Sequence, residues 1–116
     1  MQYLAVIHAD EGQWGALSDA DSNALMEEYG AFSSEAAVVD GYELDTTATA
    51  TTIRVRDGET LVTDGPFAEL KEAIGGYFVL ECESIDEACT LAGKIPGARH
   101  GAIEVRPVHV DEEAQS

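Results

Sequence analysis

The segment Tyr3 to His8 is apolar on both faces of a strand, and this feature constrains the fold most. Side chains alternate along a strand, so one face carries Leu4 and Val6 and the other carries Tyr3, Ala5 and Ile7. The segment Tyr77 to Cys82 shows the same two-sided pattern. A water-facing antiparallel sheet would carry polar residues on its open face, so a sheet of such strands must be covered on both sides.

Two amphipathic helices are predicted between the strands. Ser18 with Asp21, and Ser84 with Glu87, have the spacing of capping boxes. The apolar positions expected on the buried faces are Leu25, Tyr29, Phe32 and Ala36 in the first helix and Ile85, Ala88, Ala92 and Ile95 in the second. Gly41 is expected to follow the end of the first helix, and Pro96 to end the second.

Asp57-Gly58 is typical of a hairpin turn, and it lies between strand-like segments at 51–56 and 59–63. A short helical turn is expected at 68–72, a last strand at 102–110 and a polar tail at 111–116. Leaving out the hairpin, the order strand, helix, strand, strand, helix, strand predicts an α+β fold. It is the ferredoxin-like βαββαβ pattern with an antiparallel sheet, here as a single domain over residues 1–110.

Two helices cover only one face of such a sheet, although its strands are apolar on both. The chain has no further helices to cover the second face. The simplest cover is the same face of a second copy, so the sequence predicts a homodimer.

The charge is strongly negative, with 23 acidic and 6 basic residues and a formal net charge of −17. Such a chain repels phosphates, which argues against nucleic-acid binding. It has no apolar run of about 18 residues and no signal-peptide pattern, so a cytoplasmic protein without a membrane span is expected. Cys82 and Cys89 are expected to be two buried thiols rather than a redox pair.

Three segments together resemble a known family. They are TDGPFAELKEAIGGYFVLEC at 63–82, MQYLAVIH at the start and IPGARHGAIEVRPV near the end. Asp64-Gly65-Pro66-Phe67 and the residues after it resemble the signature of the DGPF branch of the YCII-related proteins. The resemblance covers nearly the whole chain and implies a dimeric α/β barrel, in agreement with the homodimer argued from the strands. The chemistry of this family is poorly defined, so the resemblance implies no particular reaction.

Candidate catalytic residues are His8, Asp64 and His100. Asp64 stands beside a tight turn that could fix a carboxylate at a pocket edge, or it could instead accept hydrogen bonds from the turn itself. His8 ends the first strand close to Asp10 and Glu11, a combination suited to general acid–base chemistry. His100 precedes the last strand in a segment that resembles the family pattern.

Candidate ligand-binding residues are Tyr29, Tyr77 and Arg106. Arg106 and Glu104 are two apart in the last strand and share a face, where they could bind an anion or neutralise each other. In founding YCII-like proteins a His on the first helix pairs with an acid. Tyr29 takes that place here, so their lyase and dehalogenase-type chemistry is not carried over. No zinc-binding spacing or glycine-rich phosphate loop occurs, and no metal or cofactor is expected.

Two kinds of function follow. The first is a small-molecule-binding or accessory protein that holds a ligand in the cleft of a homodimeric barrel without turnover. The second is a cofactor-free enzyme of the lyase, isomerase or monooxygenase type, which would use acid–base residues in that cleft. Relatives encoded beside extracytoplasmic-function sigma factors imply a further alternative, a regulatory partner of a sigma factor.

Overall fold

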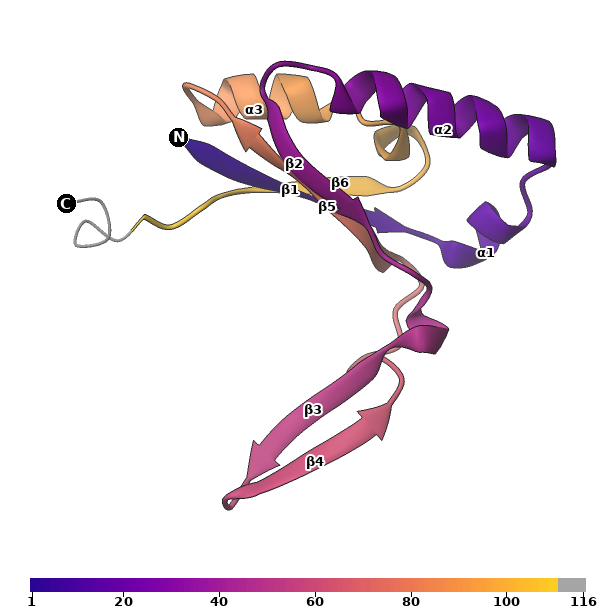
Figure 1. The fold of residues 1–116 in the computed structure, drawn as a ribbon, viewed down its shortest axis with the longest axis vertical. Coiled ribbons are helices and arrows are strands. Elements are labelled where there is room, and N and C mark those ends of the chain that lie inside the picture. Colours follow the sequence, from indigo (N-terminus) through magenta and orange to yellow (C-terminus); the bar gives the residue numbers. More distant parts are fainter. Residues whose placement is uncertain (111–116) are drawn as a thin grey trace.

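The computed structural model describes residues 1–110 and has a four-stranded antiparallel sheet at its centre (Figure 1). The strand order is β2-β5-β1-β6. The strands are β1 (Gln2–Ala9), β2 (Val38–Glu43), β5 (Ala73–Glu81) and β6 (Ala102–Pro107). With α2 (Asp19–Ser33) after β1 and α3 (Ile85–Ala92) after β5, this is the predicted α+β, ferredoxin-like arrangement.

The two main helices begin where the sequence predicts. The Ser18 Oγ accepts a hydrogen bond from the Asp21 amide (3.1 Å), and the Ser84 Oγ accepts one from the Glu87 amide (3.2 Å). The Glu87 carboxylate accepts a further hydrogen bond from the Glu83 amide (2.8 Å). These bonds satisfy amides at the first turn that have no partner within the helix.

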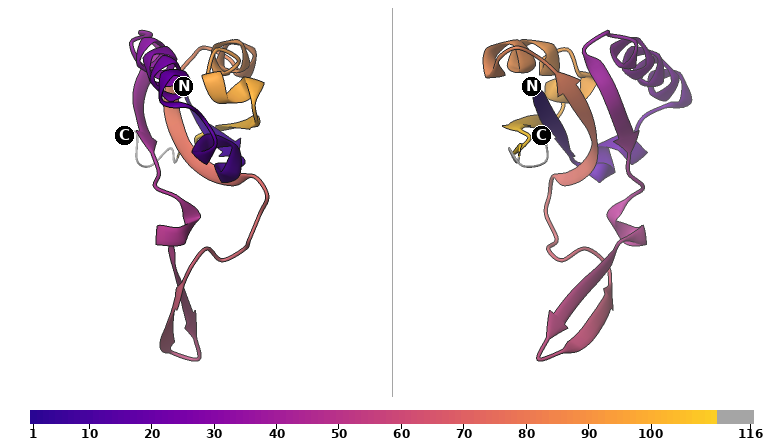
Figure 2. Two further views of the ribbon diagram at one scale, coloured as in Figure 1. Left: turned by 90° about the vertical axis from the view of Figure 1, so that its right-hand side faces the viewer. Right: turned by 60° about the vertical axis from the view of Figure 1, so that its left-hand side comes forward.

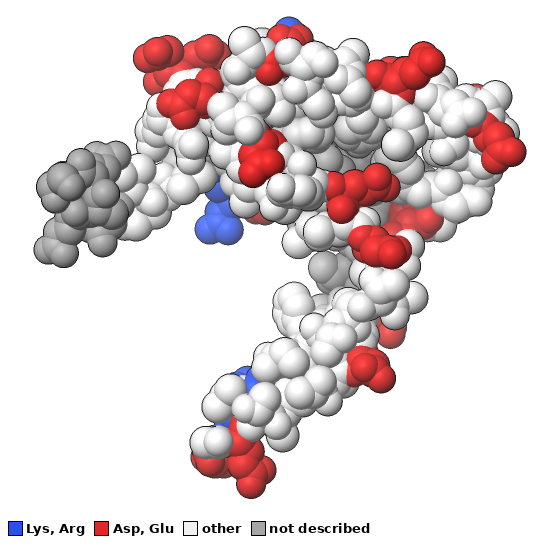
Figure 3. Space-filling model, viewed as in Figure 1, with Lys and Arg blue, Asp and Glu red and all other residues white. Residues whose placement is uncertain are grey.

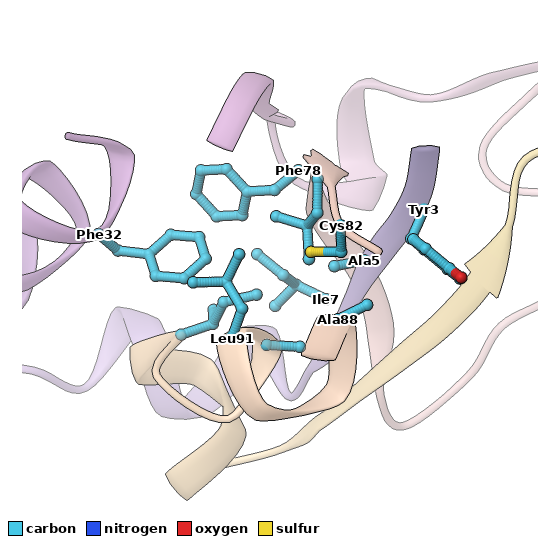
Figure 4. Packing of buried hydrophobic residues seen from close by; sticks show 11 residues of the cluster. Tyr3, Ala5, Ile7, Phe32, Phe78, Cys82, Ala88 and Leu91 are labelled. Atoms are coloured by element: carbon cyan, nitrogen blue, oxygen red, sulfur yellow. The ribbon is translucent and has the colours of Figure 1, made fainter. Parts of the chain in front are cut away.

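Both helices cover the same face of the sheet, and the core lies between them and the strands (Figures 2 and 4). Phe32 of α2 packs edge-on against Phe78 of β5, with ring centroids 4.8 Å apart. The buried cluster is completed by Tyr3, Ala5, Ile7, Leu80, Cys82, Ala88, Leu91, Ala92 and Ile95. Of the expected core residues, Tyr29 is half-buried and two are exposed. Ala36 follows the end of α2, and Ile85 lies in the exposed first turn of α3.

Several predicted boundaries are wrong because packing decides them. The helix α2 ends at Ser33, and Gly41 lies inside β2 instead of following the helix. A Cβ on Gly41 would lie 2.4 Å from the Phe78 ring, so the glycine allows β2 to approach the core. Strand β5 begins at Ala73 rather than Tyr77, and residues 68–72 form no helix.

Other differences concern short elements and the cysteines. The sequence did not predict α1 (Glu11–Gly15), whose first turn is capped by the Asp10 carboxylate. Strand β6 ends at Pro107, three residues before the expected Val110, and the expected polar tail at 111–116 lies outside the described residues. Both cysteines are free; Cys82 is buried as expected, but Cys89 is exposed.

A two-stranded hairpin, β3 (Thr51–Arg56) and β4 (Glu59–Asp64), projects from the rest of the molecule (Figures 1 and 2). We call residues 51–64 the arm and the four-stranded sheet with its helices the body. Asp57 and Gly58 have positive φ angles of 52° and 79° at the arm's tip, as a two-residue hairpin turn of this kind requires. At its base, the Glu11 carboxylate accepts hydrogen bonds from the Thr47 amide (2.8 Å) and hydroxyl (3.0 Å).

The second face of the sheet has no helix over it, and we call it the open face. In Figures 1 and 2 the helices lie on the side of the sheet away from the arm, so the open face is turned toward the arm. The strand register places Leu4 opposite Val79 and Val6 opposite Tyr77 on this face. The centre of the open face is therefore apolar, as the two-sided strand pattern predicts. Within residues 1–110, no helix has the length and apolarity needed to cross a membrane.

Candidate functional site

A pocket of about 300 Å³ opens between α2 and the edge of the sheet at β2, and we call it the Tyr29 pocket. Aromatic rings from three elements line it: Trp14 from α1, Tyr29 from α2 and Phe78 from β5. Tyr42 and Glu43 at the end of β2 stand at its border with Met26, Gly30 and Ser33 of α2. The pocket thus combines apolar walls with a few polar groups, the usual composition of a small-molecule site.

Tyr29 lies at the centre of this aromatic group. Its ring stacks on Phe78 with centroids 6.3 Å apart, and the centroid of the Trp14 ring lies 6.1 Å from that of Tyr29. Burial raises the pKa of the Tyr29 hydroxyl, while the nearby Gly97 backbone lowers it and leaves a net increase. The hydroxyl therefore stays protonated at neutral pH and can donate a hydrogen bond.

Gly97 is what allows the Tyr29 hydroxyl to lie against the backbone. A Cβ at this position would be 2.9 Å from that hydroxyl and 3.1 Å from Ile7 of β1. Gly97 belongs to η2 (Pro96–Arg99), a short 3-10 helix between α3 and β6. The segment that resembles the family near the C-terminus thus contains the glycine against which the Tyr29 hydroxyl lies.

A second groove of about 400 Å³ lies on the other side of Trp14. The Arg99 guanidinium of η2 forms an ion pair with the Glu28 carboxylate of α2 there, which ties these two elements together. His100 lines the same groove, and Asp10 and Asp21 add carboxylates. Trp14 forms part of the wall of both the groove and the Tyr29 pocket.

The open face carries a second set of predicted residues. The His8 Nε2 lies 3.7 Å from the Glu104 Oε1, and Glu104 is opposite Val6 in the strand register. Arg106 is opposite Leu4, so it shares this face with Glu104 as the sequence predicts. Tyr77 packs near Tyr42, with ring centroids 6.0 Å apart. His8 and Glu104 could exchange a proton with a ligand at this face.

Asp64 lies apart from both groups, at the end of β4 in the arm. Its side chain is exposed, and the hydrogen bonds formed within residues 1–110 include none to its carboxylate. The turn is held instead by the Gly65 amide, which donates to the Ala50 carbonyl (2.7 Å), and by the Thr52 hydroxyl, which donates to the Gly65 carbonyl (2.8 Å). The interpretation of Asp64 as the acceptor for this turn is therefore wrong.

The six predicted site residues thus lie in three places. Tyr29 and His100 line cavities on the helix side, whereas the open face holds His8, Tyr77 and Arg106, and the arm holds Asp64. Trp14 lines both cavities but was not predicted from the sequence. The available signal was that Trp14 is the single tryptophan of the chain and stands in a polar stretch. Within residues 1–110 no three His, Cys, Asp or Glu side chains converge as metal ligands.

Comparison with known proteins identifies the family. The model of the YCII-related domain matches residues 1–110, which include the strands, the helices, the arm and both cavities. The chain is also 35% identical to an uncharacterized protein of Rhizobium meliloti (strain 1021), over 93% of this chain and 92% of the relative. The match to the family model and the ferredoxin-like strand order agree, and the chain belongs to the YCII-related domain family.

Proposed function

We propose that this protein binds a small molecule in the Tyr29 pocket, without turnover, as a homodimer. The observation that carries the proposal is the half-buried Tyr29, whose ring lies near Trp14 and Phe78 in a pocket of about 300 Å³ and whose hydroxyl lies against Gly97. Because its pKa is raised, this hydroxyl serves as a hydrogen-bond donor rather than as a base. A donor among aromatic walls fits binding and orientation of a ligand better than proton abstraction.

The walls of the pocket suggest the class of ligand. Stacked aromatic rings favour a flat, apolar body, and the Tyr29 hydroxyl favours an acceptor such as a carbonyl oxygen. Glu43 at the border and the net charge of −17 disfavour anions. The ligand class is therefore a neutral or cationic aromatic compound with an acceptor group.

The homodimer is proposed from the open face. Leu4, Val6, Tyr77 and Val79 form an apolar centre there, bordered by Arg106 and Glu104. Apolar side chains on a sheet are stabilised when they are removed from water, and a second open face is a cover of matching shape and composition. The DGPF-branch signature at 64–72 supports the same dimeric α/β barrel through the resemblance of that branch.

Benzamide, 4-(aminomethyl)benzamide and benzoate provide a direct test of the pocket, because they share one ring and a carbonyl or carboxylate acceptor and are neutral, cationic and anionic. Trp14 is the single tryptophan, so its fluorescence reports binding without a label. We expect benzamide and 4-(aminomethyl)benzamide to quench Trp14 and raise the unfolding temperature at millimolar concentration, and benzoate to do neither. If all three fail in both measurements, the proposal is wrong.

The matched variants are Gly30→Leu and Ala31→Leu, neighbours on α2. Gly30 lines the pocket and a Cβ there would meet open space, so leucine should fill the pocket without strain. Ala31 is exposed and lies outside the pocket lining. Gly30→Leu should abolish the response, and Ala31→Leu should retain it. Equal fluorescence and unfolding-temperature responses from the two variants would show that the compounds bind outside the Tyr29 pocket.

The second candidate is a cofactor-free enzyme, favoured by the His8–Glu104 pair, 3.7 Å apart on the open face. In the dimer this pair would lie at the interface between the two sheets, close to Arg106. An NMR time course with any ligand found by screening separates the two functions. A binding protein leaves the ligand chemically unchanged, whereas an enzyme converts it. Conversion by the native protein that is lost in His8→Gln and kept in Tyr29→Phe would favour the enzyme.

A sigma-factor partner is the third possibility carried over from the resemblance, and it would place the protein in the cytoplasm. The charge of −17 makes contact with such a partner through protein surfaces more favourable than contact with DNA. Co-purification of a tagged sigma factor with this chain, and no retention of duplex DNA, would support it over the binding function alone.

A further inference from the structure

We propose that the arm of each subunit docks on the body of the partner in the homodimer, where its apolar face is covered. This inference rests on the proposed homodimer and adds a second contact to the one between the open faces. The arm is thus an interaction surface, and its partner is a second copy of this chain.

The arm has one face that is apolar and has no cover within its own subunit. Cross-strand partners share a face, and Ile53 is paired with Val62 and Val55 with Thr60. Ile53, Val55 and Val62 are 57%, 59% and 63% exposed, respectively. Within residues 1–110, β3 and β4 pair only with each other. A lone two-stranded hairpin is marginally stable in water, so this face gains most from a cover.

The opposite face of the arm is polar and is suited to remain in water. It carries Thr52, Arg54 and Arg56 on β3, with Thr63, Leu61 and Glu59 opposite them on β4. One face of the arm is therefore mainly apolar and the other mainly polar, as in an antiparallel sheet that is covered on one side. One face is built for a contact and the other for solvent.

Charge indicates what the arm docks on. The arm has two arginines and three acids, a net charge of −1, so the rest of the chain carries −16 of the total −17. Arg54 and Arg56 are two of only six basic residues. On the face shown in Figure 3, acidic side chains are spread over the body, which also shows basic groups, and basic and acidic side chains lie together at the far part of the arm. The arm is thus much less acidic than the body and is repelled by it only weakly.

Geometry then favours a second copy over another acidic protein. Figure 3 shows a hollow between the body and the arm, and the open face is turned toward it. A second sheet that covers the open face enters this hollow and comes to lie beside the arm. In the proposed dimer, one two-fold contact covers both apolar surfaces of each subunit.

The experiment compares Ile53→Thr with Leu61→Thr by sedimentation velocity over a range of concentrations. Both replace one aliphatic side chain on the arm with a strand-favouring residue, but on opposite faces. We expect the dimer dissociation constant to rise about tenfold for Ile53→Thr, because a covered aliphatic contact is lost, and to stay within twofold for Leu61→Thr. A third variant replaces residues 52–63 with Asn-Gly and should raise it more than Ile53→Thr does.

The outcomes separate this inference from the proposed function. If the native protein dimerises and neither Ile53→Thr nor the shortened arm weakens the dimer, arm docking is wrong and the homodimer stands. If the native protein is a monomer, both the proposed homodimer and the proposed docking of the arm are wrong. Circular dichroism checks the fold of the shortened variant; if it is unfolded, the two point variants alone decide.

Discussion

The body and the arm are both made of antiparallel strands with alternating apolar residues, but only the body has a core. Along β5, Phe78 and Leu80 point under the helices and are nearly fully buried. Along β3, Ile53 and Val55 have the same spacing and point to solvent. The same local pattern thus produces a strand in both places, and the covering layer decides how much the strand contributes to stability.

We interpret the exposed apolar residues of the arm as part of the contact surface of the proposed homodimer. The arm's turn, Asp57-Gly58, satisfies its geometry locally. By contrast, no helix or strand of residues 1–110 covers the apolar face of the arm, and no helix covers the open face. Substitutions in the body should therefore change the unfolding free energy, whereas substitutions in the arm should change association.

The largest effect expected in the body is that of Phe32→Ala. Phe32 is 4% exposed and packs on Phe78, so its truncation should lower the unfolding free energy by about 3–5 kcal/mol. Leu61→Ala in the arm should lower it by less than about 0.5 kcal/mol. Urea unfolding below the dimer dissociation constant measures both. Similar losses would show that the arm belongs to the same packed unit as the body.

A smaller effect is expected at the start of α3. Ser84→Ala removes the acceptor for the Glu87 amide and should lower the unfolding free energy by about 0.5–2 kcal/mol. Ser22→Ala, inside α2, is the control, because the Ser22 hydroxyl forms no hydrogen bond among residues 1–110. Thermal unfolding of the two variants measures the difference. An unchanged Ser84→Ala protein would contradict the importance of this cap.

The pH dependence of stability tests the environment of Tyr29. Because burial raises its pKa in the folded chain, the folded state holds its proton more tightly than the unfolded state. Its contribution is therefore intact below the ordinary tyrosine pKa of 10.0 and is lost as the pH rises above it. Tyr29→Phe should lose less stability than the native protein above pH 10.0. Parallel declines would mean that the hydroxyl is freely solvated.

The smallest effect is expected for Asp64 in the arm. Its exposed carboxylate holds no turn, so Asp64→Ala and Asp64→Asn should each change the unfolding free energy by less than about 0.5 kcal/mol. Chemical denaturation of both variants is the measurement. A loss near 1 kcal/mol for alanine alone would restore the turn-acceptor role, contrary to the hydrogen bonds described for residues 1–110.

The sequence predicts the features of the fold that rest on local chemistry or strict alternation. The caps at Ser18 and Ser84, the turn at Asp57-Gly58 and the two-sided first strand are confirmed. The wrong predictions concern segments whose residue types favour one structure but whose packing in the fold produces another. Residues 68–72 contain good helix formers but lack a buried face, and helical stability in proteins comes mostly from such a face.

The candidate site was harder to predict, because it is formed by residues far apart in the chain. Tyr29 was identified, but its partners Trp14 and Gly97 depend on how α1 and η2 fold back onto α2. A five-residue helix is too short for a periodic pattern to reveal. The grouping of Glu104 with Arg106, by contrast, follows from strand alternation, and both lie on the open face.

The assembly of the native protein is the most direct test of this account, because a second subunit is the proposed cover for both the open face and the arm. Sedimentation equilibrium at micromolar concentration in moderate salt should give twice the 12.3 kDa chain mass, with association strengthening as salt screens the −17 charges. Val79→Asp on the open face should weaken the dimer at least about 100-fold, whereas Ile85→Asp on α3 should not. A native protein that remains at 12.3 kDa throughout would contradict the account.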